Sequence, residues 1–249
     1  MRIMAISDYH GASDLLFSLG HKLEEITPDL LVFCGDAMKG YARGDEWLAA
    51  KRENRPPVRD KPEIRAAFEE DEDCLRQFFA ELGGHKIPIV CIPGNMDAPL
   101  DRYLTIMREL VTQHPNLQLV HDKEVDIAGV RVGGFGGEIV EETEEFFVLM
   151  SPADTILKNL NPDLDILLLH SPPVMERIDL DEGAHKGSAL VNQFIEQLNP
   201  RLVFCGHAHR AQGWELLFNS VVINPGALKY GNAAIVELQR PTKVDFLKI

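Results

Sequence analysis

The chain has 249 residues, enough to bury a large core, and its 45% hydrophobic and 26% charged residues are typical of a globular protein. With 25 Lys and Arg against 39 Asp and Glu, its formal net charge of −14 argues against nonspecific binding to nucleic-acid backbones. The longest apolar runs are too short to span a bilayer, no secretory segment is recognisable, and the four cysteines form no Cys-x-x-Cys pair. We therefore expect a cytoplasmic protein with reduced cysteines and no membrane association.

Short runs of Val, Ile and Leu recur along the chain with little alternation, which is typical of strands buried on both faces. Apolar residues at helical spacing predict helices at 12–26, 64–82 and 188–198, and Gly129 predicts a hairpin turn. Helices between strands indicate an α/β protein, while the closing hairpins indicate mixed strand pairing. In chain order, the predicted strands are 2–7, 30–34, 87–92, 117–120, 124–128, 130–135, 164–169, 201–205, 220–224, 233–238 and 243–248.

A hexapeptide is nearly repeated in the chain: Leu-Val-Phe-Cys-Gly-Asp at 31–36 returns at 202–207 with His in place of the final Asp. The repeat belongs to a wider pattern, because five predicted strands run into a residue that can bind a metal ion. Ligands bind at the carboxyl ends of strands in open α/β sheets, so these ends predict one shared site. They carry Asp8, Asp36, Asn95, His170 and His207.

Two further histidines complete a set of seven candidate metal ligands: Asp8, His10, Asp36, Asn95, His170, His207 and His209. In Asp-x-His and His-x-His an extended backbone would point both side chains to one side. Seven donors suffice for two cations if one carboxylate bridges, and Asp36 is the natural bridge. Two divalent ions (+4) and two carboxylates (−2) leave +2, the positive centre that the acidic chain otherwise lacks. Such a pair can activate a shared water and hold phosphoryl oxygens. The ligand types suit Mn, Fe, Co, Ni or Zn.

The ordered motifs Asp-x-His, Gly-Asp, Gly-Asn-x-Asp, His and Gly-His-x-His resemble the calcineurin-like metallophosphoesterase superfamily, from Asp8 to about Gly226. The segments HSPP, HKGS, GHAH and INPG most resemble the small class-III-type, metallophosphoesterase-domain-containing phosphodiesterases. The resemblance implies an α/β fold, a four-layer αββα sandwich of two mixed sheets, with one copy of the repeat in each half. It implies one domain over 1–249. It also implies one metal ion on Asp8, His10, Asp36 and His209, and a second on Asp36, Asn95, His170 and His207. The predicted catalytic residues are Asp36, Asn95, His170 and His209.

One position departs from the family pattern. Many members read Gly-Asn-His-Asp or Gly-Asn-His-Glu, where the His is thought to protonate the leaving oxygen, but here the residue is Met96. Asp97, which would orient that His, then lacks its partner. Because general acid catalysis is typically worth ~10²–10⁴-fold, we expect phosphodiesters with acidic leaving groups to react faster than alkyl phosphomonoesters.

Two other regions are candidates for substrate contact. His185 lies in a Gly-flanked loop before a helix, and it is either a substrate contact or a surface residue. The stretch 37–86 is long for a connection and rich in Lys and Arg, so we predict an inserted arm or lid; a solvated arm or a dimer contact is the alternative. We interpret the glutamates at 138–145 as a solvated face, and His21, His85, His114 and His121 as structural or solvated.

These observations predict a dinuclear metal-dependent phosphodiesterase that hydrolyses small or nucleotide-like phosphodiesters with a bridging hydroxide. Two alternatives remain: a phosphomonoesterase or protein phosphatase, and a noncatalytic scaffold like the retromer subunit that resembles phosphoesterases. The complete ligand set argues against the scaffold, and Met96 argues against the protein phosphatase. The expected partner is a small phosphoester, without specific nucleic-acid binding, and self-association is left open.

Overall fold

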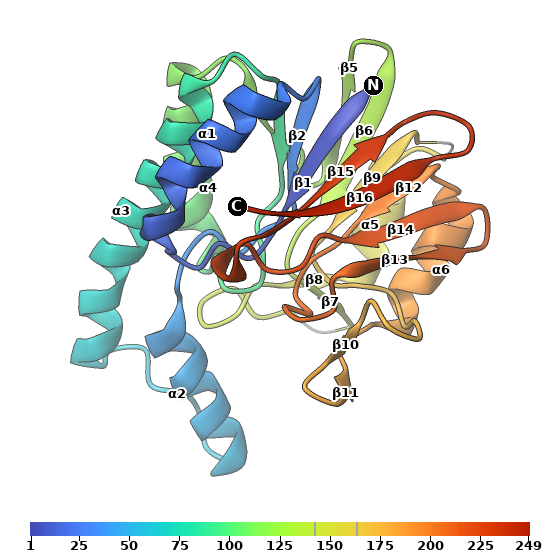
Figure 1. Ribbon diagram of the computed structural model, residues 1–249. Coiled ribbons are helices and arrows are strands. Elements are labelled where there is room, and N and C mark those ends of the chain that lie inside the picture. The colour runs from blue at the N-terminus through green and yellow to red at the C-terminus, as the bar shows by residue number, and fades with distance from the viewer. Residues whose placement is uncertain (142, 163) are drawn as a thin grey trace.

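The computed structural model describes residues 1–141, 143–162 and 164–249. Two six-stranded mixed sheets lie face to face, and helices cover both outer faces, which confirms the expected αββα sandwich (Figure 1). The first sheet has the order β16-β15-β1-β2-β3-β4, and the second has the order β13-β14-β12-β9-β6-β5. In the first sheet β1 to β4 run parallel, and in the second sheet β6, β9, β12 and β14 do so. Antiparallel strands complete the edges of both sheets.

The strands of the first sheet are β1 (Arg2–Ile6), β2 (Leu30–Phe33), β3 (Ile89–Cys91), β4 (Leu117–Leu119), β15 (Asn232–Glu237) and β16 (Lys243–Lys248). Those of the second are β5 (Lys123–Ile127), β6 (Val130–Phe135), β9 (Ile166–Leu169), β12 (Leu202–Phe204), β13 (Gly213–Leu217) and β14 (Ser220–Asn224). Short pairs are formed by β7 (Glu138–Val140) with β8 (Met150–Pro152) and by β10 (Leu180–Asp181) with β11 (Ala184–His185). The helices are α1 (Leu16–Ile26), α2 (Tyr41–Arg52), α3 (Pro62–Gly84), α4 (Leu100–Gln113), α5 (Ala153–Asn159) and α6 (Ala189–Leu198), with 3-10 turns at Ser13–Leu15 and Leu228–Tyr230.

All eleven predicted strands are present within a few residues, and the predicted hairpin turns at Ala128 and Gly129 between β5 and β6. Strand β13, the short pairs, and helices α2, α4 and α5 were not predicted from the sequence. β13 is an edge strand whose residues alternate between exposed and half-buried, so it lacks the apolar run that marks the central strands. The short strands have only two or three residues each, too few for a recognisable apolar run.

Three apolar layers hold the sandwich together. Between the sheets, Val32 and Ile3 of the first sheet pack with Ile166 and Phe204 of the second. The alternate residues of the same strands face the helices: Phe33 packs against the layer of α1, α3 and α4, and Val203 belongs to the layer of α5 and α6. Because both faces of β2 and β12 are covered, an uninterrupted apolar run is required in both, which explains the repeated Leu-Val-Phe.

Helix α2 projects away from the sheets together with the start of α3 (Figure 1). A small separate cluster of Ile64, Phe147 and Val148 packs with Trp47 and anchors this projection to the segment before β8. Several of its basic residues serve in structural ion pairs. The buried Arg43 contacts Asp71 at 2.6 Å, and Arg55 and Lys61 both pair with Glu46. In the described part of the chain no helix is long and apolar enough to cross a membrane. All four cysteines are free, and three of them are buried.

Candidate metal centre

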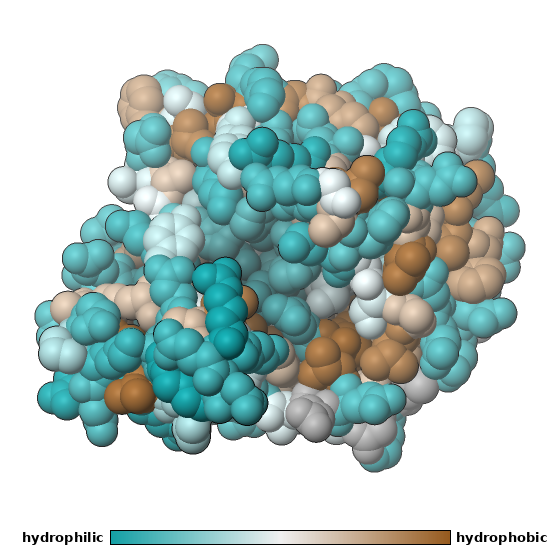
Figure 2. Space-filling model, turned by 90° about the horizontal axis from the view of Figure 1, so that it is seen from below, coloured by the Kyte–Doolittle hydropathy of each residue, from teal (hydrophilic) through white to brown (hydrophobic). Residues whose placement is uncertain are grey.

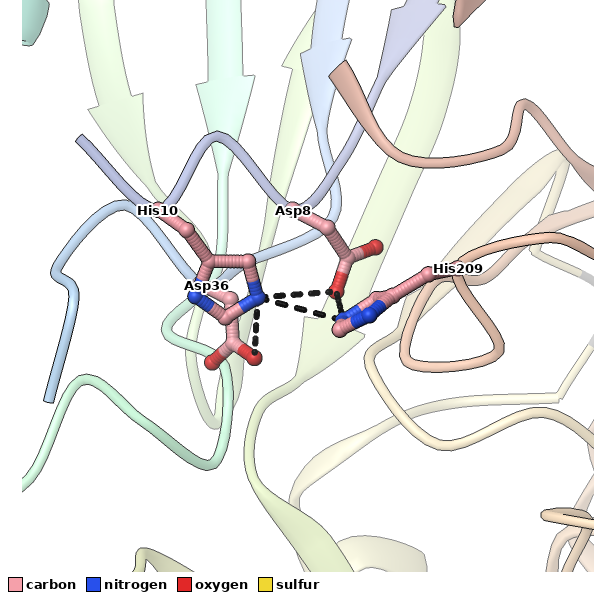
Figure 3. Close-up of side chains that lie close together, drawn as sticks. All are labelled: Asp8, His10, Asp36 and His209. Carbon is pink, nitrogen blue, oxygen red and sulfur yellow. Dashed lines mark hydrogen bonds and ion pairs between the residues drawn. The ribbon is translucent and has the colours of Figure 1, made fainter. Parts of the chain in front are cut away.

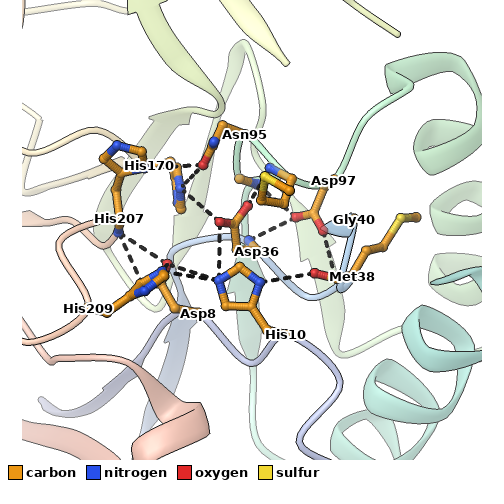
Figure 4. Close-up of polar contacts among 12 residues, drawn as sticks. Asp8, His10, Asp36, Met38, Gly40, Asn95, Asp97, His170, His207 and His209 are labelled. Atoms are coloured by element: carbon orange, nitrogen blue, oxygen red, sulfur yellow. Dashed lines mark hydrogen bonds and ion pairs between the residues drawn. The ribbon is translucent and has the colours of Figure 1, made fainter. Parts of the chain in front are cut away.

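The predicted ligands converge at one edge of the sandwich, where the carboxyl ends of both sheets meet (Figure 4). The first sheet supplies Asp8 and His10 after β1, Asp36 after β2 and Asn95 after β3. The second sheet supplies His170 after β9, and His207 and His209 after β12. Parallel order brings these strand ends side by side within each sheet, and the face-to-face packing brings the two sets together.

One group consists of Asp8, His10, Asp36 and His209, whose donor atoms lie within 4.8 Å of one another (Figure 3). The Nε2 atoms of His10 and His209 are 3.1 Å apart. Asp36 Oδ2 lies 3.5 Å from His10 Nε2, and Asp8 Oδ1 lies 3.3 Å from His209 Nε2. Nitrogen and carboxylate donors aimed at a common point are the arrangement that a divalent metal ion requires.

A second group shares Asp36 with the first. His170 Nε2 lies 3.4 Å from the same Asp36 Oδ2 and 2.8 Å from Asn95 Oδ1. His207 Nδ1 also approaches Asn95 Oδ1, at 3.2 Å. One carboxylate oxygen of Asp36 therefore faces both groups, and all seven predicted residues lie in the centre.

Backbone carbonyls fix the rings of two histidines. His10 Nδ1 is 3.2 Å from the carbonyl of Met38, and His170 Nδ1 is 2.7 Å from the carbonyl of Cys34. A carbonyl only accepts, so in both rings Nδ1–H is the donor and Nε2 is the nitrogen that faces the centre. This tautomer is the one that a metal-binding imidazole needs, and the donor set therefore fits divalent ions.

The charges of the centre favour a bound cation. Burial would raise the pKa of Asp8, but the hydrogen bond with His209 and the charge of His170 outweigh it and hold this pKa well below its usual range. Burial would lower the pKa of His170, but the charge and hydrogen bond of Asp36 prevail and raise it to about 10. Burial lowers the pKa of His207 to about 4, so that this ring stays neutral. Two buried carboxylates in one centre attract positive charge, and the raised pKa of His170 is one consequence.

Four of the seven residues have a left-handed backbone conformation: Asp8 (φ 56), His10 (φ 47), Asp36 (φ 61) and His207 (φ 66). The expectation that an extended backbone aligns the Asp8 and His10 pair is therefore wrong, because tight turns aim these side chains instead. A non-glycine residue in this region is strained by about 1 kcal/mol or more, and such strain concentrates at functional sites.

Asp97 has no histidine to orient at position 96, but its carboxylate has other partners. Its carboxylate accepts hydrogen bonds from the backbone N–H groups of Asp36 (2.9 Å), Met38 (2.9 Å) and Gly94 (2.7 Å). Burial and the nearby charge of Asp36 raise its pKa to about 7, although the backbone bonds lower it. Asp97 thus ties the loop after β2 to the loop after β3, whatever residue occupies position 96.

Glu138 contacts the candidate centre rather than lying on the solvated face that the acidic run predicts. Glu138 begins β7 and is half-buried, and its Oε1 accepts a hydrogen bond from Asn95 Nδ2 at 3.2 Å. This contact turns the amide so that Asn95 Oδ1 faces His170 and His207. The acidic run gives no local sign of this contact. Glu138 is half-buried because β7 pairs with β8, whereas Glu141 and Glu145 further along the run are exposed.

The remaining histidines lie outside the centre. His185, the possible substrate contact, is exposed on β11, and its Nδ1 contacts Asp179 at 3.0 Å. The same hairpin carries Asp181, which accepts the backbone N–H of His209 at 3.0 Å. His21 is exposed, and His121 is half-buried with its Nδ1 accepting the N–H of Gly136. His85 and His114 follow the ends of α3 and α4.

A family model described as metallophosphoesterase, calcineurin superfamily, matches residues 1–249. The chain therefore belongs to this family of phosphoric ester hydrolases.

Relatives of the same length support this assignment. An uncharacterized protein of Methanocaldococcus jannaschii is 25% identical over 245 residues, which cover 92% of this chain and 90% of the relative. One crystal structure is 32% identical with a TM-score of 0.86, covering 99% of this chain and 98% of the other. A crystal structure from Thermus thermophilus is 25% identical with a TM-score of 0.77 and the same coverage.

Proposed function

We propose that this chain is a dinuclear metal-dependent phosphodiesterase that acts on small or nucleotide-like phosphodiesters. The observation that carries the proposal is the position of Asp36 Oδ2, 3.5 Å from His10 Nε2 and 3.4 Å from His170 Nε2. A single oxygen facing two convergent donor groups is what a shared ligand between two ions requires. The family membership supports hydrolysis of a phosphoric ester at this centre.

In this proposal Asp8, His10, Asp36 and His209 hold one ion, and Asp36, Asn95, His170 and His207 hold the other. Bound divalent ions, of Mn, Fe, Co, Ni or Zn, supply Lewis-acid polarisation of the phosphoryl group and a water of lowered pKa. The chain's own residues keep the donors in place. The carbonyls of Met38 and Cys34 orient two imidazoles, and Asp97 holds the backbone of Asp36.

The preference for diesters rests on the residue at position 96. Met96 has no proton to give, so a leaving oxygen must depart with little protonation from this position. An acidic leaving group tolerates this better than an alkoxide does. Among the other groups, His185 is the proposed substrate contact, because its hairpin is bonded to His209 through Asp181.

The test uses purified protein, treated with a chelator and then reloaded separately with Mn²⁺, Zn²⁺, Ni²⁺, Co²⁺ or Fe²⁺. We expect about two ions per chain and hydrolysis of bis(p-nitrophenyl) phosphate that is faster than hydrolysis of an alkyl phosphomonoester. Faster monoester turnover would overturn the diester assignment. Bound metal without turnover of any ester would identify a scaffold instead.

A further inference from the structure

A cavity of about 360 Å³ opens directly beside the candidate metal centre. Asn95, Met96 and Glu138 form the wall that it shares with the centre. Its apolar lining consists of Tyr41, Trp47, Leu48, Met96, Val148 and Met150. Seen from this end of the sandwich, the surface has a hollow near its middle that is lined by hydrophilic residues, and hydrophobic residues gather beside it (Figure 2). A volume of this size is typical of small-ligand sites, in which an apolar lining accompanies a few polar groups.

The outer wall of the cavity is held rigidly. Trp47 of α2 stacks on Phe147 with ring centroids 6.0 Å apart and an interplanar angle of 17°. Phe147 and Val148 belong to the small cluster that anchors α2, and both are buried. An indole packed in this way lines the cavity and loses little conformational freedom when a ligand binds.

The side chain of Met96 forms part of the cavity wall. A Cβ added at Gly44 would lie 2.8 Å from Met96 Cε, and one at Gly40 would lie 3.0 Å from the same atom. Glycines at these two positions of the α2 segment therefore make room for the methionine. Its thioether is a soft, polarisable group that packs well against aromatic rings.

Tyr41 joins the cavity to the metal centre. Its ring lies roughly parallel to the imidazole of His10, with centroids 6.0 Å apart, and it also lines the cavity. Lys51 supplies a positive charge on the lining, with its ammonium 4.7 Å from the centroid of the Trp47 ring. Asp45 and Glu138 are the acidic residues on the same lining.

We infer that this cavity is the subsite for a flat aromatic group, a nucleobase or a simple aryl ring, carried by the phosphoester bound at the centre. The inference rests on the proposed function, because the phosphoryl group must lie at the centre for its substituent to reach the cavity. Trp47 and Met96 are then specificity-determining residues for that substituent.

Binding of product analogues tests the subsite directly. The chain has two tryptophans, and Trp214 lies on β13 in a different cavity, so Trp214→Phe leaves Trp47 as the only indole reporter. The variant, loaded with Zn²⁺, is titrated calorimetrically and by fluorescence with inorganic phosphate, methyl phosphate, phenyl phosphate and adenosine 5′-monophosphate. We expect at least one aromatic ligand to bind about 10-fold or more tightly than methyl phosphate, with a saturable change in Trp47 emission.

The two aromatic ligands distinguish the sources of the ring. A gain in affinity only with the nucleotide indicates a nucleobase, and a gain with phenyl phosphate as well indicates any aryl group. Equal affinities for methyl and aromatic phosphates, or tight aromatic binding with unchanged Trp47 emission, would overturn the inference.

Kinetics separate failure of the subsite from failure of the proposed function. We expect Trp47→Ala to raise the KM for bis(p-nitrophenyl) phosphate about 10-fold while Trp214→Ala leaves it unchanged, with thermal unfolding confirming that both variants fold. If the wild type hydrolyses the diester and Trp47→Ala matches it, only the subsite is wrong. If the metal-loaded wild type hydrolyses no phosphoester and binds no phosphate, the proposed function itself is wrong.

Discussion

The two copies of Leu-Val-Phe-Cys-Gly end in the same backbone conformation but give different positions in the metal centre. Asp36 after β2 has φ 61 and His207 after β12 has φ 66, and each follows a strand buried on both faces. Asp36 is buried and its carboxylate lies against histidines of both donor groups, whereas the imidazole of His207 approaches Asn95 of the second group and its backbone N–H donates to Asp8 of the first. In the proposed function, the same local structure therefore supplies a ligand shared by both ions in one sheet and a ligand of a single ion in the other.

The glycines before these two residues differ as well. Gly35 has φ +96, and a Cβ there would lie 2.4 Å from the backbone nitrogen of Gly94. A Cβ at Gly206 would instead meet side-chain atoms, with Ser7 Oγ at 2.0 Å and Asp8 Oδ2 at 2.7 Å. A side chain at position 35 would therefore clash with the backbone. A side chain at position 206 would instead collide with the side chains of Ser7 and Asp8, and Asp8 is a candidate metal ligand.

The largest effect should distinguish the shared ligand from the single one. Asn tolerates left-handed backbone, so Asp36→Asn and His207→Asn change the donor without adding strain. We expect Asp36→Asn to lower kcat/KM by about 10³-fold or more, because the loss of the shared carboxylate disturbs both donor groups at once. His207→Asn should retain one ion per chain, because Asp8, His10, Asp36 and His209 remain. Metal analysis checks both variants, and two ions in active Asp36→Asn would refute the shared role.

The glycine pair should separate stability from activity. We expect Gly35→Ala to destabilise the fold by about 3 kcal/mol or more, because the strained φ and a backbone clash act together. Gly206→Ala should cost less stability but disturb Asp8, and Ser7→Ala in the same chain should restore part of the loss. Urea unfolding and metal affinity measure the two effects, and equal losses of stability at both positions would remove the distinction.

Glu138 tests whether the orientation of Asn95 matters to the second donor group. Removing the acceptor in Glu138→Leu should lower kcat and the affinity for the second ion by about 10–100-fold, as is usual for residues that orient metal ligands. Glu138→Gln keeps an acceptor oxygen and should recover most of this loss. The exposed Glu145 provides a control in Glu145→Gln, and a similar loss in that variant would point to a general charge effect.

The smallest effect concerns His121, which lies where the chain passes from the first sheet to the second. Burial lowers its pKa from 6.5 to about 4. Below pH 6.5 the unfolded chain therefore binds a proton that the folded chain does not, so stability is full above this pH and falls toward pH 4. We expect a loss of about 1–2 kcal/mol by pH 5. Unfolding of wild type and His121→Gln at pH 7 and 5 checks this, and an unchanged difference between the two proteins would exclude it.

Much of the fold and centre was predictable because the signals are local. An uninterrupted Val, Ile and Leu run marks a strand covered on both faces, and a Cys-Gly turn marks its carboxyl end. Parallel order then requires these ends to meet, so all seven candidate ligands were identified from sequence. Helix α4 could also have been recognised, since Tyr103, Ile106, Met107 and Leu110 recur at helical spacing and are buried.

What the sequence alone determined is the succession of central strands along the chain and the chemical identity of the donors, because strand periodicity and residue type depend only on neighbours in the chain. The four-layer arrangement was implied by the family resemblance. Tertiary structure alone decided that Asp36 faces both groups, that Asp97 holds backbone amides, and that Glu138 turns Asn95. It also decided that Trp47 and Met96 share one cavity wall. These contacts join residues far apart in sequence, and their geometry depends on how the packed layers bring separate loops together.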